Sequence, residues 1–184
     1  MQPADAGRLG VDKRVGTRND RAWTQGRDDK RSCQRQDLRR AGSLPPWQAA
    51  ERLGALIFIH QGDPTLVTAR LEKYLLINTI GNLVDRTVIF ASLVFGGVID
   101  RFPGLKICLA HGGGYSCIGI GHMDCGRQVR PEARTHIETP PSEYLRRVYS
   151  DTVTHDDSAL KMLVDTTGAE CILFCTDWPA DLRI

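Results

Sequence analysis

Residues 105–114, LKICLAHGGG, place one histidine at the end of a short apolar run and follow it with three glycines. The run is rich in Leu, Ile and Cys, so it predicts a buried strand. His111 would then lie at the carboxyl end of that strand, where parallel α/β sheets and barrels usually have their catalytic and ligand-binding residues. The glycines let the backbone turn sharply or approach a ligand closely. On this stretch alone, a hydrogen-bonded core histidine beside a tight turn is an equally good interpretation.

Two further apolar runs lead into polar residues in the same way. Residues 55–60, ALIFIH, end on His60, and residues 171–176, CILFCT, are followed by Asp177. Neutral imidazole and carboxylate are ordinary ligands of zinc and similar divalent ions. Three strands that deliver His, His and Asp therefore predict a metal site at one edge of a sheet, which none of the three would predict alone.

Helical patterns alternate with these apolar runs. Helices are predicted over 46–54, 65–77, 78–102, 142–147 and 156–167. Residues 115–125 are expected to be helical or irregular, because three glycines limit them there. A further strand is predicted over 148–153, in which Asp151 is expected to make an internal hydrogen bond. Four strands separated by helical segments predict a parallel α/β sheet.

Length and charge limit what this sheet can belong to. The 184 residues fall short of the ~250 of a complete (β/α)8 barrel. Residues 1–46 carry 11 Lys and Arg against 6 Asp, whereas the rest carries 13 against 16 acidic residues. We expect 1–45 to be a basic, disordered or atypical N-terminal segment, and 46–184 to be the folded part. A nucleic-acid-binding arm is less favoured, because aspartates interrupt the basic residues.

The cysteines and the hydropathy pattern indicate a cellular location. None of the six cysteines forms a CxxC pair, and four lie in or beside apolar runs, as reduced cysteines do. No apolar run approaches the ~18 residues of a membrane span. We therefore expect a cytoplasmic protein with neither a membrane segment nor a nucleic-acid partner.

Several phrases of this sequence resemble the amidohydrolase-related decarboxylases, the group of 2-amino-3-carboxymuconate-6-semialdehyde decarboxylase. They are FIH at 58–60, NTIGN at 78–82, FGGVIDRFPGLKICLAHGGG at 95–114, RPEAR at 130–134, PSEYLRR at 141–147, YSDTVTHD at 149–156 and TDWPAD at 176–181. Their order and spacing make the resemblance specific over about three quarters of the chain.

The resemblance implies a partial (β/α)8 TIM barrel of the metal-dependent hydrolase type, with strands five to eight present. It implies a divalent metal, usually zinc, held by His60 and Asp177, with His111 as the catalytic base. In that family, hydroxide on the metal adds to an unsaturated or aromatic carbon beside a carboxylate, and CO2 leaves. The implied activity is that of a carboxy-lyase that acts on a small carboxylate. A divalent metal can supply the hydroxide for this reaction, because it lowers the pKa of its bound water toward ~7.

Two departures from the family pattern keep other interpretations open. The sequence has no His-x-His pair, from which the family takes two more ligands. His122 stands where the family has an arginine that clamps the substrate carboxylate and reaches a neighbouring subunit, so it is a candidate substrate-binding residue in an expected homodimer. A surface or structural role is the alternative for His122, and it is the role expected for His136 and His155, because none of the three has a paired ligand at a useful spacing.

Three functions therefore remain open at the level of sequence. The first is the metal-dependent decarboxylase, and the second is a hydrolase of the same superfamily. The third is a truncated, non-catalytic remnant of the barrel, because three protein ligands are typical of a catalytic zinc site and only two are implied here. An esterase of the α/β-hydrolase fold is excluded, because HGGG would need a downstream Gly-x-Ser-x-Gly that the sequence lacks.

Overall fold

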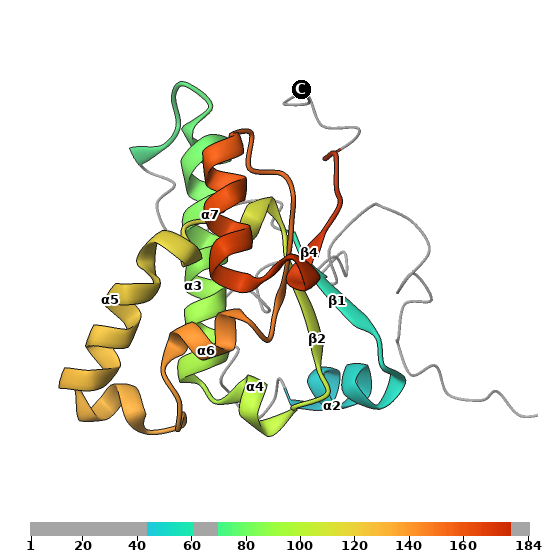
Figure 1. Cartoon of the computed structure of the whole chain (residues 1–184), viewed down its shortest axis with the longest axis vertical. Helices are drawn as coiled ribbons and strands as arrows, with labels where there is room; N and C mark the ends of the chain where they lie inside the picture. The colour runs from blue at the N-terminus through green and yellow to red at the C-terminus, as the bar shows by residue number, and fades with distance from the viewer. Residues whose placement is uncertain (1–43, 61–69, 178–184) are drawn as a thin grey trace, which may run out of the picture.

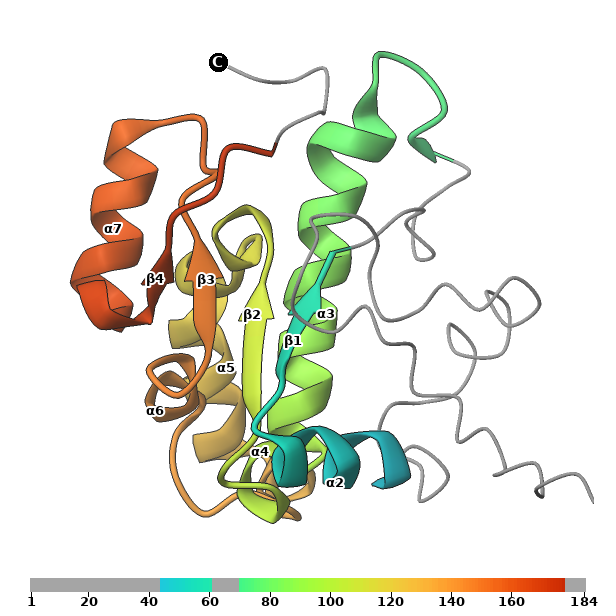
Figure 2. The same ribbon diagram turned by 90° about the vertical axis from the view of Figure 1, so that its right-hand side faces the viewer.

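A computed structural model describes residues 44–60 and 70–177 of the chain (Figure 1). Four strands form one parallel sheet and lie side by side in chain order. They are β1 (Leu56–Ile59), β2 (Lys106–Leu109), β3 (Tyr149–Asp151) and β4 (Ile172–Leu173). Figure 2 shows the strands pointing the same way, so their carboxyl ends meet at one edge. The predicted parallel α/β arrangement is confirmed.

The helices α3, α5, α6 and α7 lie to one side of the strands in Figure 1. The helices are α2 (Leu44–Leu53), α3 (Asn82–Phe95), α4 (Val98–Arg101), α5 (Ser116–Val129), α6 (Pro141–Leu145) and α7 (Asp157–Thr167). Short 3₁₀ turns cover His111–Gly113, Pro131–Arg134 and Ala169–Cys171, and a π-helical turn, Ile77–Gly81, leads into α3. Within the described ranges, no helix is both long and apolar enough to cross a bilayer.

Two predictions fall partly outside the described residues. The predicted N-terminal segment 1–45 lies outside them except for its last two residues, which already belong to α2. Of the helix predicted over 65–77, residues 65–69 also lie outside. Residues 70–76 form mostly turns rather than a continuous helix, so that part of the prediction is wrong.

The core lies between α3 and the sheet. Phe90, Leu93 and Val94 of α3 have no exposed surface, and they share one apolar cluster with Ile107 and Leu109 of β2. Each such side chain contributes about 1.5–3 kcal/mol through its removal from water. This packing holds α3 against β2 and so sets where the N-terminal turns of α3 lie relative to the strand ends.

The opposite face of β1 is open. Leu56 and Phe58 are 39% and 36% exposed, whereas Ile57 between them is buried. Because successive side chains of a strand point to opposite faces, Ile57 faces the core and its two neighbours face away from it.

The helix predicted over 78–102 is broken near its end. Gly97 adopts a left-handed conformation with φ 69°, and it separates α3 from α4. A Cβ at this position would come within 2.9 Å of the backbone oxygen of His136. A loop some forty residues later therefore packs directly against Gly97 and leaves no room for a side chain at this position.

The strands around Asp151 and Cys175 are shorter than predicted. The carboxylate of Asp151 accepts the N–H of Val153 at 3.1 Å, so the chain leaves the ladder after Asp151. The N–H of Cys175 is taken by the hydroxyl of Thr152 at 3.0 Å, and β4 ends at Leu173. Side chains, not neighbouring strands, satisfy the backbone there.

Candidate metal centre

His60, His111 and Asp177 converge at the carboxyl edge of the sheet. His60 directly follows β1, His111 opens the turn after β2, and Asp177 follows β4. Asp177 Oδ1 lies 3.7 Å from His60 Nε2 and 3.6 Å from His111 Nε2. The two imidazole rings meet edge to face with centroids 5.1 Å apart. Segments from three different strands thus deliver three donor side chains to one small volume.

This donor set fits a divalent ion. The two distances from Asp177 Oδ1, 3.7 and 3.6 Å, are close to the separation of about 3.3–3.6 Å between donors that share a tetrahedral metal at about 2.0–2.2 Å. His111 Nε2 is buried and has no hydrogen-bond partner in the described part of the chain. A buried nitrogen without a partner is unfavourable, and a metal or a bound water would satisfy it. Imidazole and carboxylate donors suit zinc, manganese or a similar cation.

Three consecutive left-handed glycines shape the turn that carries His111. Gly112, Gly113 and Gly114 have φ of 59°, 74° and 65°, and His111 itself has φ 55°. A Cβ on Gly114 would lie 2.2 Å from the backbone oxygen of Leu83 in α3. Tyr115 also donates its N–H to Thr87 Oγ1 of that helix at 2.9 Å. The glycines therefore let the turn lie directly on α3.

Asp151 holds the same turn from the other side. Its carboxylate is 1% exposed and accepts the N–H of Gly112 at 2.9 Å. Burial raises the pKa of Asp151, although the backbone N–H groups that it accepts act in the opposite direction. The internal hydrogen bond expected for Asp151 is confirmed. This residue connects β3 to the turn after β2 and thereby fixes the position of His111.

Both histidines of the centre are held in the neutral form. Burial, followed by the charge of Arg86, lowers the pKa of His111 to about 4. The same two causes, in the same order, lower the pKa of His60. A neutral imidazole keeps a lone pair free to bind a metal or to accept a proton. The site is thus prepared for either role at neutral pH.

This shift predicts a pH dependence of stability for the metal-free chain. The pKa of His111 moves from 6.5 to about 4 on folding, so the unfolded chain binds more protons between these values. Stability should therefore rise with pH from about pH 4 to 6.5 and level off above it. Urea unfolding across this window should show a shallower rise for His111→Gln than for the wild type. Parallel pH profiles for the two chains would contradict the assignment.

Arg86 is the residue of this region that sequence reasoning missed. It lies in the first turns of α3 and is completely buried. Burial lowers the pKa of Arg86 to about 10, which leaves it charged at neutral pH. The signal was available in the sequence, because Arg86 stands four residues before Phe90 and seven before Leu93. That spacing places a charge on the apolar face of the helix.

The remaining histidines lie apart from the centre. His122 is exposed on α5, and His136 and His155 are exposed in loops. None of them belongs to the cluster of donor atoms formed within residues 44–60 and 70–177. The surface positions expected for His136 and His155 are confirmed. Substrate binding by His122 stays a prediction.

A parallel sheet in chain order, with donor side chains at its carboxyl edge, has the architecture of part of a (β/α)8 barrel with a metal site. The amidohydrolase family profile matches residues 13–183. The chain therefore belongs to the amidohydrolase family, as the motifs implied.

The relatives of the chain are decarboxylases. It is 34% identical over 140 residues to 2-amino-3-carboxymuconate-6-semialdehyde decarboxylase of Dictyostelium discoideum, covering 76% of this chain and 39% of that protein. It is 29% identical to gamma-resorcylate decarboxylase of a Polaromonas strain, covering 73% of this chain and 43% of that protein. The chain thus spans about two fifths of the length of these relatives.

Solved structures share the fold. The 5-carboxyvanillate decarboxylase of Sphingomonas paucimobilis superposes with a TM-score of 0.70 at 23% identity, over 78% of this chain and 45% of that one. A dihydroxybenzoic acid decarboxylase of Polaromonas, solved with manganese and the inhibitor 2-nitroresorcinol, gives 0.69 at 24% identity over 77% of this chain and 45% of that one. The sheet is accordingly part of a TIM barrel, and the open face of β1 is the one that a complete barrel would turn inward.

Proposed function

We propose that this chain carries the metal-binding edge of a carboxy-lyase that removes CO2 from a small unsaturated or aromatic carboxylate. The convergence of His60, His111 and Asp177 within 4.8 Å carries this proposal. Membership of the amidohydrolase family and the likeness to three kinds of decarboxylase support it. Zinc is the metal that we first propose, and manganese, which a structural relative binds, is the alternative.

His60 and Asp177 are the residues that would hold the metal. His60 is partly exposed and Asp177 largely buried, with side chains 39% and 17% exposed, so the site is open on the side of His60. A divalent ion held there would supply Lewis acidity and would bring the pKa of its water toward ~7. The neutral state of His60 leaves its Nε2 lone pair available for the ion.

His111 is the proposed proton acceptor and donor. Its Nε2 is buried, lies 3.6 Å from Asp177 Oδ1, and points into the same volume. Because burial keeps this imidazole neutral, Nε2 can accept a proton from water beside the ligands and return it to the carbon that loses CO2. The turn of three glycines and the Asp151 carboxylate hold the ring in place for this transfer.

Metal content and CO2 release test this function together. The full-length chain, loaded with Zn²⁺ or Mn²⁺ and desalted, is expected to retain about one equivalent of metal. It should release CO2 from 2,6-dihydroxybenzoate or 2-amino-3-carboxymuconate-6-semialdehyde, and a chelator should abolish that release. Retention of far less than one equivalent would contradict the proposal for this chain.

A non-catalytic remnant of the barrel is the second candidate, and the open face of β1 favours it. Leu56 and Phe58 expose apolar surface that a complete barrel would enclose, and exposed apolar patches promote association between molecules. This candidate predicts self-association without CO2 release. A monodisperse chain that unfolds cooperatively and binds metal would contradict it. A hydrolase that acts through the same residues is a further candidate function. We also propose that the protein forms a homodimer and is located in the cytoplasm.

A further inference from the structure

Arg86 presents an unused edge of its guanidinium within the protein. Its Nη1 donates to the backbone oxygen of Asn82 at 2.6 Å, one turn earlier in α3. Its Nε and Nη2 are buried and have no hydrogen-bond partner in the described part of the chain. Buried donors of a charged group are costly to leave without an acceptor. Nε and Nη2 of Arg86 therefore need a hydrogen-bond acceptor that the described residues do not provide.

The guanidinium lies close to the candidate metal centre. Its charge acts on His60 and His111 and on the carboxylates of Asp151 and Asp177. In Figure 2, the first turns of α3, the helix that carries Arg86, stand beside the carboxyl ends of β1 and β2. The contact between Gly114 and Leu83 brings the same turns of α3 against the loop that carries His111. Arg86 is thus a buried positive charge beside the donor cluster.

The free edge has the geometry of a carboxylate receptor. Nε–H and Nη2–H lie on one side of the planar guanidinium and point in nearly parallel directions. Two oxygens of one carboxylate can accept both bonds at once, which is the bidentate arrangement that distinguishes Arg from Lys. The bond to Asn82 uses the other side of the group, so it leaves this edge unoccupied and fixes its direction.

We propose that the Nε–Nη2 edge of Arg86 binds a carboxylate group of the substrate and so makes this site selective for anions. The inference rests on the proposed function, because it takes the ligand to be the carboxylate that this centre transforms. Arg86 supplies the positive charge from α3, a position separate from His122 on α5. An ordered water in place of the carboxylate is the competing explanation for the free edge.

Benzoate and benzamide test the inference, because they have similar shapes and differ in charge. Calorimetric titration of the full-length wild-type chain, with and without bound Mn²⁺, should show roughly 10- to 100-fold weaker binding of benzamide. Arg86→Gln should weaken benzoate binding to the level of benzamide, and Arg86→Lys should restore only part of the loss. Equal affinities of the wild type for the two probes would overturn the inference without recourse to any variant.

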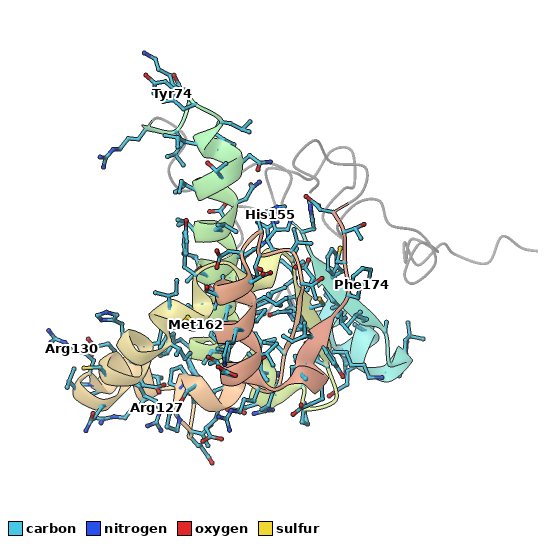
Figure 3. All side chains as sticks on the ribbon, turned by 45° about the horizontal axis from the view of Figure 1, so that its top comes forward. Tyr74, Arg127, Arg130, His155, Met162 and Phe174 are labelled. Atoms are coloured by element: carbon cyan, nitrogen blue, oxygen red, sulfur yellow. The ribbon has the colours of Figure 1, made fainter. Side chains whose placement is uncertain are left out.

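Arg130 provides a matched control. It is exposed at the end of α5, far from the strand ends (Figure 3), so Arg130→Gln should bind benzoate as the wild type does. An unchanged KM for CO2 release in Arg86→Gln would overturn the inference while the proposed function stood. Arg86-dependent benzoate binding in a chain that releases no CO2 would instead support the anion site and contradict the proposed function.

Discussion

Replacing Gly114 with alanine is expected to destabilise the chain by on the order of 3 kcal/mol or more. Gly114 has φ 65° and ψ −133°, a conformation essentially reserved for glycine. The added Cβ would lie 2.2 Å from the backbone oxygen of Leu83. Backbone cannot rotate out of the way as a side chain can, so either α3 or the turn must move. Chemical denaturation of the metal-free chain measures the loss.

Gly121 is the control for this substitution. It lies inside α5, is exposed, and would place its Cβ in open space. Gly121→Ala should therefore stabilise the chain by up to about 1 kcal/mol, the ordinary gain of alanine over glycine in a helix. Equal denaturation midpoints for Gly114→Ala and the wild type would show that the turn and α3 are not in contact.

The position of the site could be predicted from the sequence because it follows from topology. Parallel strands in one sheet end at the same edge, so polar residues that follow successive strands must come close together. This rule alone is enough to group His60, His111 and Asp177. The residues that end each strand were harder to predict, because Asp151 and Thr152 satisfy backbone groups that the apolar pattern assigns to a ladder.

Contacts between distant segments explain the other differences. At Gly97, the backbone of His136 packs directly against the glycine, and no local pattern contains that contact. α5 shows the opposite case. It continues past Gly126 to Val129, and the packing of Cys117 and neighbouring apolar side chains into the core offsets the low helix propensity of its glycines.

The burial of Arg86 is not indicated by any of the sequence motifs. Helical spacing alone puts it on the face of Phe90 and Leu93, yet a charge in an apolar helix is usually assigned to the solvent side. Its complete burial is a tertiary fact. The family resemblance made His122 the candidate for substrate binding, whereas the structure makes the Arg86 guanidinium beside His60 and His111 the candidate.

The roles proposed for His111 and Asp177 predict that their substitutions change different quantities, the rate of CO2 release and the affinity for metal. Asp177→Asn should lower metal affinity by more than about 100-fold, because it removes a ligand rather than a group behind one. His111→Gln should leave the metal content nearly unchanged and should lower the rate of CO2 release by roughly 10²- to 10⁴-fold, the usual contribution of a general acid–base residue. Metal analysis and single-turnover CO2 release on the same preparations separate the two effects.

His136→Gln is the matched control, because His136 is exposed and lies outside the donor cluster. It should change neither metal content nor rate. The geometry also defines how the assignment could fail, since His111 Nε2 is as close to Asp177 Oδ1 as His60 Nε2 is. If His111→Gln loses the metal as fully as Asp177→Asn does, then His111 is a third ligand, and the proton acceptor must be sought elsewhere at this edge of the sheet.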